Sequence, residues 1–299
     1  MGPLLFFLSV LSALRFTVTE VPSLELIHPR TVTQISASEL AGFAPYTQFA
    51  RAAYCPTDVL KTWTCGEACQ ANADFEVAFV GGDGDDIQNC RYSPSLGAII
   101  VAHEGTDPTQ LESDLTDIDI PLAKPSNALF PGISSSVEVH SGFLNEHALS
   151  ARSILAEVDS LMASKGVNKI VAVGHSLGGA LAEIDTVFLR LNIPSASISA
   201  MTYGTPRVGN PAWAALVDSS NVNFKRIDNK QDLIPIVPGR FLGFEHPAGE
   251  IHILGAGDAV SCPGDDDATD SDCQICADAF HLIKLGPYEG IYLGTIYCT

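Results

Sequence analysis

Basic residues are scarce in this chain: 16 Lys and Arg stand against 35 Asp and Glu, which gives a formal net charge of −19 over 299 residues. Nucleic acid and anionic membrane surfaces are disfavoured as partners, because their phosphates would repel so acidic a protein. The sequence contains no Asn-x-Ser/Thr motif, so N-linked glycosylation is not expected. It also contains no internal repeat and no long linker, and its 46% of hydrophobic residues suffice for one globular domain.

Long apolar runs are missing as well. The strongest one, Pro3 to Leu14, is shorter than the roughly 20 residues that cross a bilayer, so no transmembrane segment is expected. This run is typical of the core of a secretory signal peptide. We therefore expect a signal peptide over residues 1–19, one domain over residues 20–299 and a secreted, extracellular protein. The eight cysteines show no zinc-type spacing with histidine, and their even number in a secreted chain indicates disulfides.

Apolar runs of strand length alternate with helical patterns along the chain. Strands are expected at Phe75–Val80, Leu96–Ala102, Ile170–Val173, Ala196–Tyr203 and Asn223–Ile227. Helices are expected at Ser38–Tyr54, Asn145–Lys165 with Gly166 as its stop, Leu177–Leu191 and Pro211–Val217. This order predicts an α/β fold, in which helices cover both faces of a mostly parallel central sheet.

One serine lies between two glycines where a predicted strand meets a predicted helix, in Gly174-His175-Ser176-Leu177-Gly178. The turn is too tight for side chains at its flanks, and it lifts the Ser176 hydroxyl out at the carboxyl end of the sheet. The helix that follows directs its free N–H groups at the same place, where the Leu177 N–H would stabilise an oxyanion. The pattern predicts a nucleophilic serine, and a structural turn capped by the serine is the alternative.

A serine nucleophile needs a base, and the base needs an acid that holds its tautomer. On this type of fold the chain order is serine, acid, histidine. The residues that follow in that order are Asp218, Asp228 and Asp232, and then His246, His252 and His281. Asp232 is favoured over Asp228 because it lies just past a predicted strand, where loops carry function. His281, near the C-terminus, is the candidate base.

A second oxyanion donor is expected in the loop after an earlier strand. In the segment VAHEGTDP, Gly105 allows the turn, and Thr106 could offer both its N–H and its hydroxyl. An ordinary polar loop end is the alternative.

Several ordered segments resemble the fungal class 3 lipases: GHSLGGALA, VHSGFL, YGTPRVGN, DLIPIVP and LGFEHPAGEIHI. The resemblance runs from about Ser38 to Cys298, and it implies an α/β-hydrolase fold, carboxylic ester hydrolysis and no metal or cofactor. The matching positions imply the nucleophile at Ser176, the acid at Asp232 and the base at His281. They imply oxyanion donors at Thr106 and Leu177.

The cysteines resemble the family's pattern too. The resemblance implies that Cys55 pairs with Cys298, Cys65 with Cys69, and Cys262 with Cys273. The two cysteines left over, Cys90 and Cys276, are then expected to pair with each other.

Two segments of the sequence favour different classes of ester substrate. The segment that matches the lipase lid, Asp107–Leu115, is quite polar and favours a feruloyl esterase or a general carboxylesterase. The insertion Pro121–Ser136 has four large apolar residues that would line an acyl groove or form a surface cluster, and it favours a triacylglycerol lipase. A monomer that acts on lipid esters is expected, with a lipid–water interface as a candidate partner. A non-catalytic secreted binding protein is the remote alternative.

Overall fold

The computed structural model describes residues 31–82, 87–106, 121–230, 232–266 and 272–273, all within the compact unit Thr31–Thr299. The expected signal peptide, the segment Asp107–Leu115 and the candidate base His281 lie outside the described residues. None of the described helices is both long and apolar enough to cross a membrane.

The described strands form a nine-stranded sheet in the order β1-β11-β10-β9-β8-β7-β4-β3-β2. The five central strands, β10 to β4 in that order, are parallel, and the two strands at each edge are antiparallel. The strands are β1 Thr33–Gln34, β2 Glu76–Gly82, β3 Ile87–Ser93, β4 Ala98–His103, β7 Lys169–His175, β8 Ser197–Tyr203, β9 Asn223–Asn229, β10 Glu250–Gly255 and β11 Asp258–Ser261. A separate pair consists of β5 Leu122–Ala123 and β6 Val139–His140.

The helices follow the predicted order closely. They are α1 Ala37–Gly42, α2 Ala44–Ala52, α3 Thr57–Thr62, α4 Glu67–Gln70, α6 Ser141–Lys165, α7 Leu177–Asn192 and α8 Pro211–Ser219, with 3-10 turns η1 Ile234–Ile236 and η2 Arg240–Leu242. The single helix expected over Ser38–Tyr54 is instead two, because Pro45 has no N–H for the helical hydrogen bond and breaks the run at Phe43. Helix α6 does end at Gly166, whose φ of 66° is left-handed.

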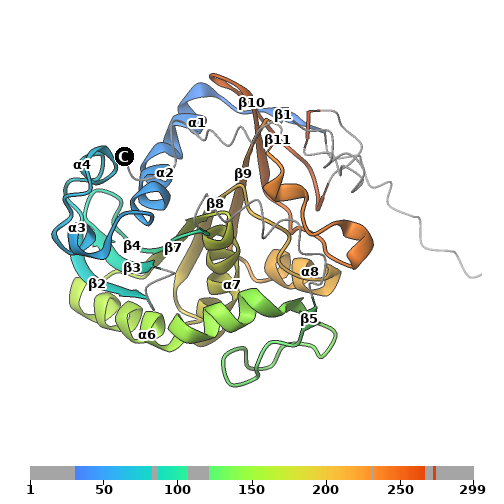
Figure 1. The fold of residues 1–299 in the computed structure, drawn as a ribbon, viewed down its shortest axis with the longest axis horizontal. Helices are drawn as coiled ribbons and strands as arrows, with labels where there is room; N and C mark the ends of the chain where they lie inside the picture. The colour runs from blue at the N-terminus through green and yellow to red at the C-terminus, as the bar shows by residue number, and fades with distance from the viewer. Residues whose placement is uncertain (1–30, 83–86, 107–120, 231, 267–271, 274–299) are drawn as a thin grey trace, which may run out of the picture. The chain divides into compact units, whose positions relative to one another are not determined.

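Helices cover both faces of the sheet, as the sequence predicts. Along β4, Ile99 and Val101 face a core shared with α6, α7 and α8, whereas Ile100 and Ala102 face a core shared with α1 and α2. This period of two is the pleat of a strand that is buried on both sides. Figure 1 shows α1 and α2 on one side of the sheet and α6, α7 and α8 on the other. The fold is the α/β-hydrolase type.

The insertion between β5 and β6 packs against the body of the protein. Phe130 is 1% exposed and belongs to the core shared with α6, α7 and α8, with Leu129 and Ile133 packed at its edge. The Phe130 ring lies edge-on to Phe188 of α7, at 5.9 Å between centroids. These side chains therefore anchor the insertion and do not line an open groove.

The cysteines follow the predictions with one correction. The Cys65–Cys69 and Cys262–Cys273 disulfides are present. Cys55 is disulfide-bonded, and its expected partner Cys298 lies outside the described residues. The expected bond between Cys90 and Cys276 is wrong, because Cys90 is a free thiol, 1% exposed, whose side chain is part of the apolar core.

Candidate active site

The candidate nucleophile lies on a strained turn between β7 and α7. Ser176 has φ 56° and ψ −124°, a conformation that L side chains rarely adopt, and it is 2% exposed. Its N–H donates to the carbonyl of Tyr203 at the end of β8, at 3.0 Å, so the neighbouring strand holds the turn. The flanking glycine at 174 is obligatory: a Cβ there would lie 2.1 Å from the carbonyl oxygen of Gly178.

The loop that carries the candidate oxyanion donor lies directly against this turn. A Cβ at Gly178 would come within 2.4 Å of the carbonyl oxygen of His103 and 2.6 Å of that of Glu104. The end of β4 and the first turn of α7 are thus in backbone contact, which only glycine allows. Thr106 follows on this loop and is half-buried, and Leu177 is the first residue of α7, where the N–H has no helical partner.

Tyr54 and His175 pack against the loop that follows β4. Tyr54 Oη lies 2.7 Å from Nδ1 of His175, the residue before the serine. Burial lowers the pKa of His175 to about 3, so its ring is neutral at physiological pH. A Cβ at Gly105 would lie 2.2 Å from Tyr54 Oη and 2.4 Å from the His175 carbonyl oxygen, so Gly105 is packed between them.

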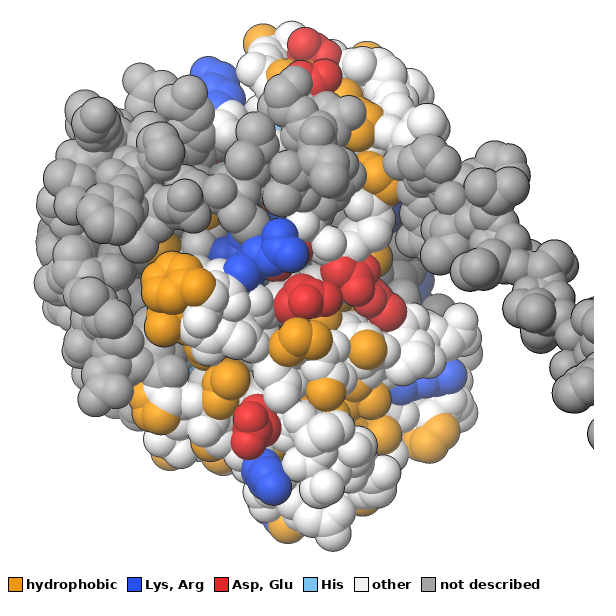
Figure 2. All heavy atoms as spheres, turned by 90° about the vertical axis from the view of Figure 1, so that its right-hand side faces the viewer, with side chains coloured by type: hydrophobic (Ala, Val, Ile, Leu, Met, Phe, Trp, Pro, Cys, Tyr) orange, Lys and Arg blue, Asp and Glu red, His pale blue; other side chains and the backbone are white. Residues whose placement is uncertain are grey.

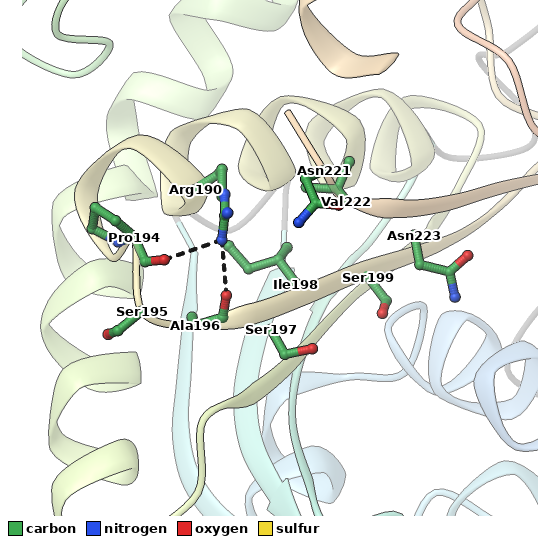
Figure 3. Close-up of a pocket in the computed structure, with 10 residues that line it drawn as sticks. All are labelled: Arg190, Pro194, Ser195, Ala196, Ser197, Ile198, Ser199, Asn221, Val222 and Asn223. Atoms are coloured by element: carbon green, nitrogen blue, oxygen red, sulfur yellow. Dashed lines mark hydrogen bonds between the residues drawn. The ribbon is translucent and has the colours of Figure 1, made fainter. Parts of the chain in front are cut away.

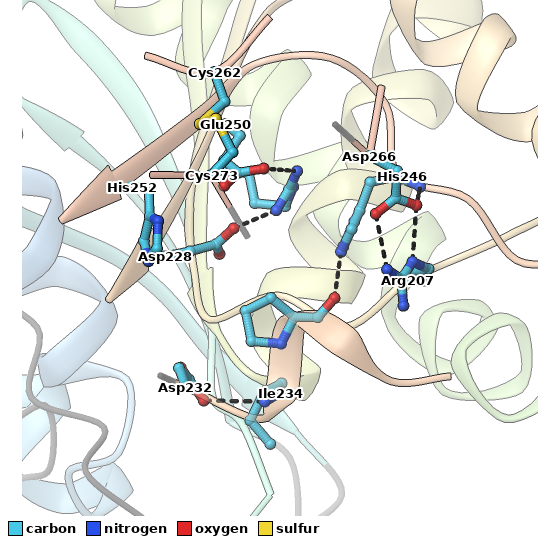
Figure 4. Close-up of polar contacts among 12 residues, drawn as sticks. Arg207, Asp228, Asp232, Ile234, His246, Glu250, His252, Cys262, Asp266 and Cys273 are labelled. Carbon is cyan, nitrogen blue, oxygen red and sulfur yellow. Dashed lines mark hydrogen bonds and ion pairs between the residues drawn. A yellow bond between two sulfur atoms is a disulfide. The ribbon is translucent and has the colours of Figure 1, made fainter. Parts of the chain in front are cut away.

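Two of the three candidate acids, Asp228 and Asp232, lie in different surroundings at the end of β9. Asp228 is fully buried and forms an ion pair with Arg226, whose other nitrogen is 3.1 Å from Glu250 Oε2. Asp232 is 1% exposed and accepts the Ile234 N–H at 3.0 Å (Figure 4). Burial raises the pKa of Asp232 to about 7, and the Ile234 N–H opposes that rise. Asp228 is committed to an arginine, and Asp232 remains the candidate acid.

Arg207 fixes the loop that carries Asp232. Its guanidinium donates to both oxygens of Asp266 at 2.8 Å each (Figure 4). It also donates to the carbonyls of Ile236 and Pro238 at 2.6 and 2.9 Å. Fork-shaped donation of this kind is specific to arginine. Asp266 lies in the loop that the Cys262–Cys273 disulfide closes, so Arg207 joins that loop to the acid loop.

Two of the three candidate histidines are engaged elsewhere. His246 Nε2 donates to the carbonyl of Pro235 at 2.8 Å, and both ring nitrogens of His252 face backbone carbonyls, those of Lys230 and Asp272. Both rings are buried and hold loops together. The prediction of His281 as the base lies outside the described residues and stays a prediction.

The site contains residues that were not predicted from the sequence: Tyr54, Arg207 and a buried cluster of His103, His147 and Asp185. One signal was available: Glu183 and Asp185 interrupt an otherwise apolar stretch of α7, and every residue from 178 to 189 is buried. Acids in such a helix must be paired or protonated.

A hollow of about 710 Å³ lies at the other end of the sheet. It is lined by Arg190 of α7, by Ser197 and Ser199 of β8 and by Asn223 of β9, at the amino ends of the strands (Figure 3). Ser176 and Asp232 follow the carboxyl ends, where ligands bind in open α/β sheets, so this hollow is separate from the candidate site. No cluster of His, Cys, Asp or Glu suited to a metal ion occurs in the described part of the chain.

Comparison with known proteins agrees with this geometry. A family model, "Lipase (class 3)", matches residues 100–242, which include Thr106, Ser176 and Asp232. A solved lipase from Rhizopus microsporus var. chinensis superposes with a TM-score of 0.73 at 27% identity, over 80% of this chain and 84% of that one. This stretch of the chain, residues 100–242, matches the class 3 lipase family. The family match ends before His281.

Two further similar proteins are informative. A secreted mono- and diacylglycerol lipase from Malassezia globosa is 30% identical over 186 residues, 61% of each chain. This chain thus spans about three-fifths of that relative's length. A solved triacylglycerol lipase, described as having a serine protease triad as its catalytic centre, has a TM-score of 0.72 at 25% identity, over 81% of this chain and 91% of that one.

Proposed function

We propose that this protein is a serine carboxylic ester hydrolase, a triacylglycerol lipase, with Ser176, Asp232 and His281 as its triad. The observation that carries the proposal is the strained conformation of Ser176 at the start of α7, with the β4 loop in backbone contact beside it. A serine held at positive φ costs about 1–3 kcal/mol, and such strain persists at functional sites. The structural likeness to a triacylglycerol lipase with a serine protease triad supports the same function.

The reaction follows from these positions. His281 takes the proton from the Ser176 hydroxyl as that oxygen attacks the ester carbonyl, and the N–H of Leu177 with Thr106 stabilises the oxyanion. The alcohol leaves with the proton from His281, and water then hydrolyses the acyl-enzyme with His281 as the base. Asp232 orients His281 and stabilises its charged form. No metal or cofactor takes part.

The proposed substrates are uncharged acylglycerols. The named relatives act on mono-, di- and triacylglycerols, and Phe241 and Leu242 on η2, shortly after the acid loop, are 72% and 37% exposed. On the face shown in Figure 2, hydrophobic side chains lie scattered among polar ones, so no broad apolar patch of described residues covers it. A feruloyl ester remains the second candidate, because the segment Asp107–Leu115 is polar.

Secretion is part of the proposal. Two relatives that are 30% and 31% identical to this chain are named secreted lipases. The chain also has disulfides, which persist in oxidising compartments. We propose a signal peptide over residues 1–19 and a single secreted, monomeric domain over residues 20–299.

A paired assay tests the function. The purified protein is given emulsified triolein across its solubility limit and, separately, methyl ferulate, with Ser176→Ala as the matched control. We expect triolein hydrolysis that the control loses by about 10⁶-fold. Fast ferulate cleavage with negligible triolein hydrolysis would instead make this a feruloyl esterase. Full activity in the Ser176→Ala variant would refute the mechanism.

A further inference from the structure

Three buried side chains from three elements meet beneath the candidate oxyanion loop. His103 Nε2, at the end of β4, donates to Asp185 Oδ2 of α7 at 2.7 Å, and His147 Nε2 of α6 donates to Asp185 Oδ1 at 2.9 Å. All three side chains are 0% exposed. Each carboxylate oxygen therefore has an imidazole donor, and the carboxylate joins the strand to both helices.

Asp185 is charged in this cluster. Burial alone would raise the pKa of Asp185, but the hydrogen bonds and charges of His103 and His147 lower it to about 2. A buried carboxylate is tolerated only where it is fully hydrogen-bonded, and charge-assisted bonds are shorter and stronger than neutral ones. The two contacts are thus strong constraints on where β4 and α6 lie relative to α7.

The hydrogen bond from His103 to Asp185 is one of two contacts between the end of β4 and α7. The carbonyl of His103 already lies against Gly178, in the first turn of α7, and Asp185 is about two helical turns further along the same face. The end of β4 therefore meets α7 at two points, one through backbone and one through side chains. His103 is also paired with Gln88 and Gly174 in the sheet, so the loop that follows it starts from a fixed residue.

Both candidate oxyanion donors belong to these two elements. Thr106 extends from β4 just after His103, and Leu177 is the first residue of α7. We propose that the His103–Asp185 hydrogen bond is the positioning contact that sets Thr106 relative to Leu177, so that both donors meet one oxyanion. This inference rests on the proposed esterase function. His147 supports Asp185 from α6, which carries neither donor.

Oxyanion donors act only within a narrow range, about 2.7–3.1 Å from the oxygen of the intermediate. Loss of one whole donor lowers kcat by about 10²–10³, so a donor that is only displaced should cost about tenfold. The effect should fall on kcat and spare KM, because the oxyanion exists only after the substrate has bound.

The test compares His103→Phe with His147→Phe on a soluble short-chain ester. Each change removes one imidazole donor from the same buried carboxylate, so loss of thermal stability should be similar. We expect kcat to fall about tenfold in His103→Phe and to stay within about twofold in His147→Phe, with KM within about twofold in both. Equal losses of kcat in the two variants would overturn the inference and leave a purely structural cluster.

A double mutant shows whether the loss of kcat in His103→Phe acts through Thr106. In a Thr106→Ala background the His103→Phe change should cost less than its tenfold loss of kcat in the wild type, because the Thr106 hydroxyl, one of the two displaced donor groups, is already gone. An undiminished tenfold loss in that background would overturn the inference. If His103→Phe does not fold, His103→Gln and His103→Asn replace it, since glutamine places an N–H near the imidazole Nε2 and asparagine falls short. Glutamine should then restore kcat, and equal activity of the two amides would overturn the proposal.

The same experiment separates this inference from the function on which it rests. A wild-type protein without Ser176-dependent hydrolysis would refute both. Normal wild-type hydrolysis with indistinguishable histidine variants would refute the positioning role alone.

Discussion

Single residues at the candidate site differ sharply in what surrounds them. Asp228 and Asp232 lie close together in the chain and are both buried, yet one is paired with Arg226 and the other accepts the backbone N–H of Ile234. The two carboxylates are equally buried but have different hydrogen-bond partners. The two carboxylates should therefore respond oppositely to the same substitution.

Asn at each position tests this contrast. Asp232→Asn should lower kcat by about 10³–10⁴-fold, because a neutral amide cannot stabilise the charged histidine, and should leave stability unchanged or slightly higher. Asp228→Asn should keep kcat in the folded fraction but cost about 3–5 kcal/mol of stability, because it removes one of the two buried carboxylates that pair with Arg226. Measurements of kcat and of thermal unfolding for both variants test these expectations. A larger loss of kcat in Asp228→Asn would move the acid to that residue.

Gly178 offers a second test at this scale. Ala at 178 would place a Cβ 2.4 Å from the His103 carbonyl oxygen, so the β4 loop must shift and we expect kcat to fall at least about 100-fold. The control is Gly42→Ala at the end of α1, where no atom lies within 4 Å of the added Cβ and activity should be unchanged. Wild-type kcat in Gly178→Ala would show that the loop has no role.

Helix α7 shows how one element serves both the core and the site. It is buried on all sides from Gly178 to Leu189, and its two acids are accommodated in different ways. Asp185 is held as a carboxylate by two histidines, whereas burial raises the pKa of Glu183 to about 8, partly opposed by the Trp213 N–H that it accepts at 2.7 Å. Glu183 is therefore a neutral acid in the folded protein at pH 7.

This protonation makes stability depend on pH. Between about pH 4.5 and pH 8 the folded protein holds a proton on Glu183 that the unfolded chain has released, so stability is lost as pH rises through this window. The slope from this one group is at most about 1.4 kcal/mol per pH unit. Glu183→Gln keeps the acceptor for Trp213 and removes the proton. Unfolding of both proteins at pH 5, 6, 7 and 8 should show the variant gaining on the wild type with rising pH, and parallel curves would contradict this.

At the scale of the whole molecule, the net charge of −19 sets how the protein meets a lipid surface. An uncharged acylglycerol droplet exerts no repulsion, but an anionic one does, and the repulsion reaches further at low salt. The proposed lipase should therefore hydrolyse a tributyrin emulsion more slowly when an anionic phospholipid is added at about 10 mM NaCl. At about 500 mM NaCl the difference should vanish. Initial rates in a pH-stat measure this, and faster hydrolysis on the anionic emulsion at low salt would contradict it.

Much of the architecture could be predicted from local patterns. The strand–Ser176–helix junction was predictable because a tight turn between two glycines depends on neighbouring residues alone. The central parallel strands were predictable because strands buried on both faces read as apolar runs. The break between α1 and α2 was not predicted, although its signal, Pro45, is local. The strands β3, β10 and β11 escaped prediction, because their sequences mix polar and charged residues with the apolar ones and so lack the continuous apolar run of the central strands.

Other features depend on which distant residues come into contact. The free Cys90, the pairing of Arg207 with Asp266, and the contact of His103 with Asp185 all depend on how the elements pack and on the face on which each side chain lies. A buried charge pairs with the opposite charge that the fold brings close to it, whatever their separation in the sequence. Leaving it unpaired in a low-dielectric core costs more free energy than any local conformational preference supplies. The order of residues thus predicts the serine turn and the family, and three-dimensional packing determines which acids and histidines are left to act beside it.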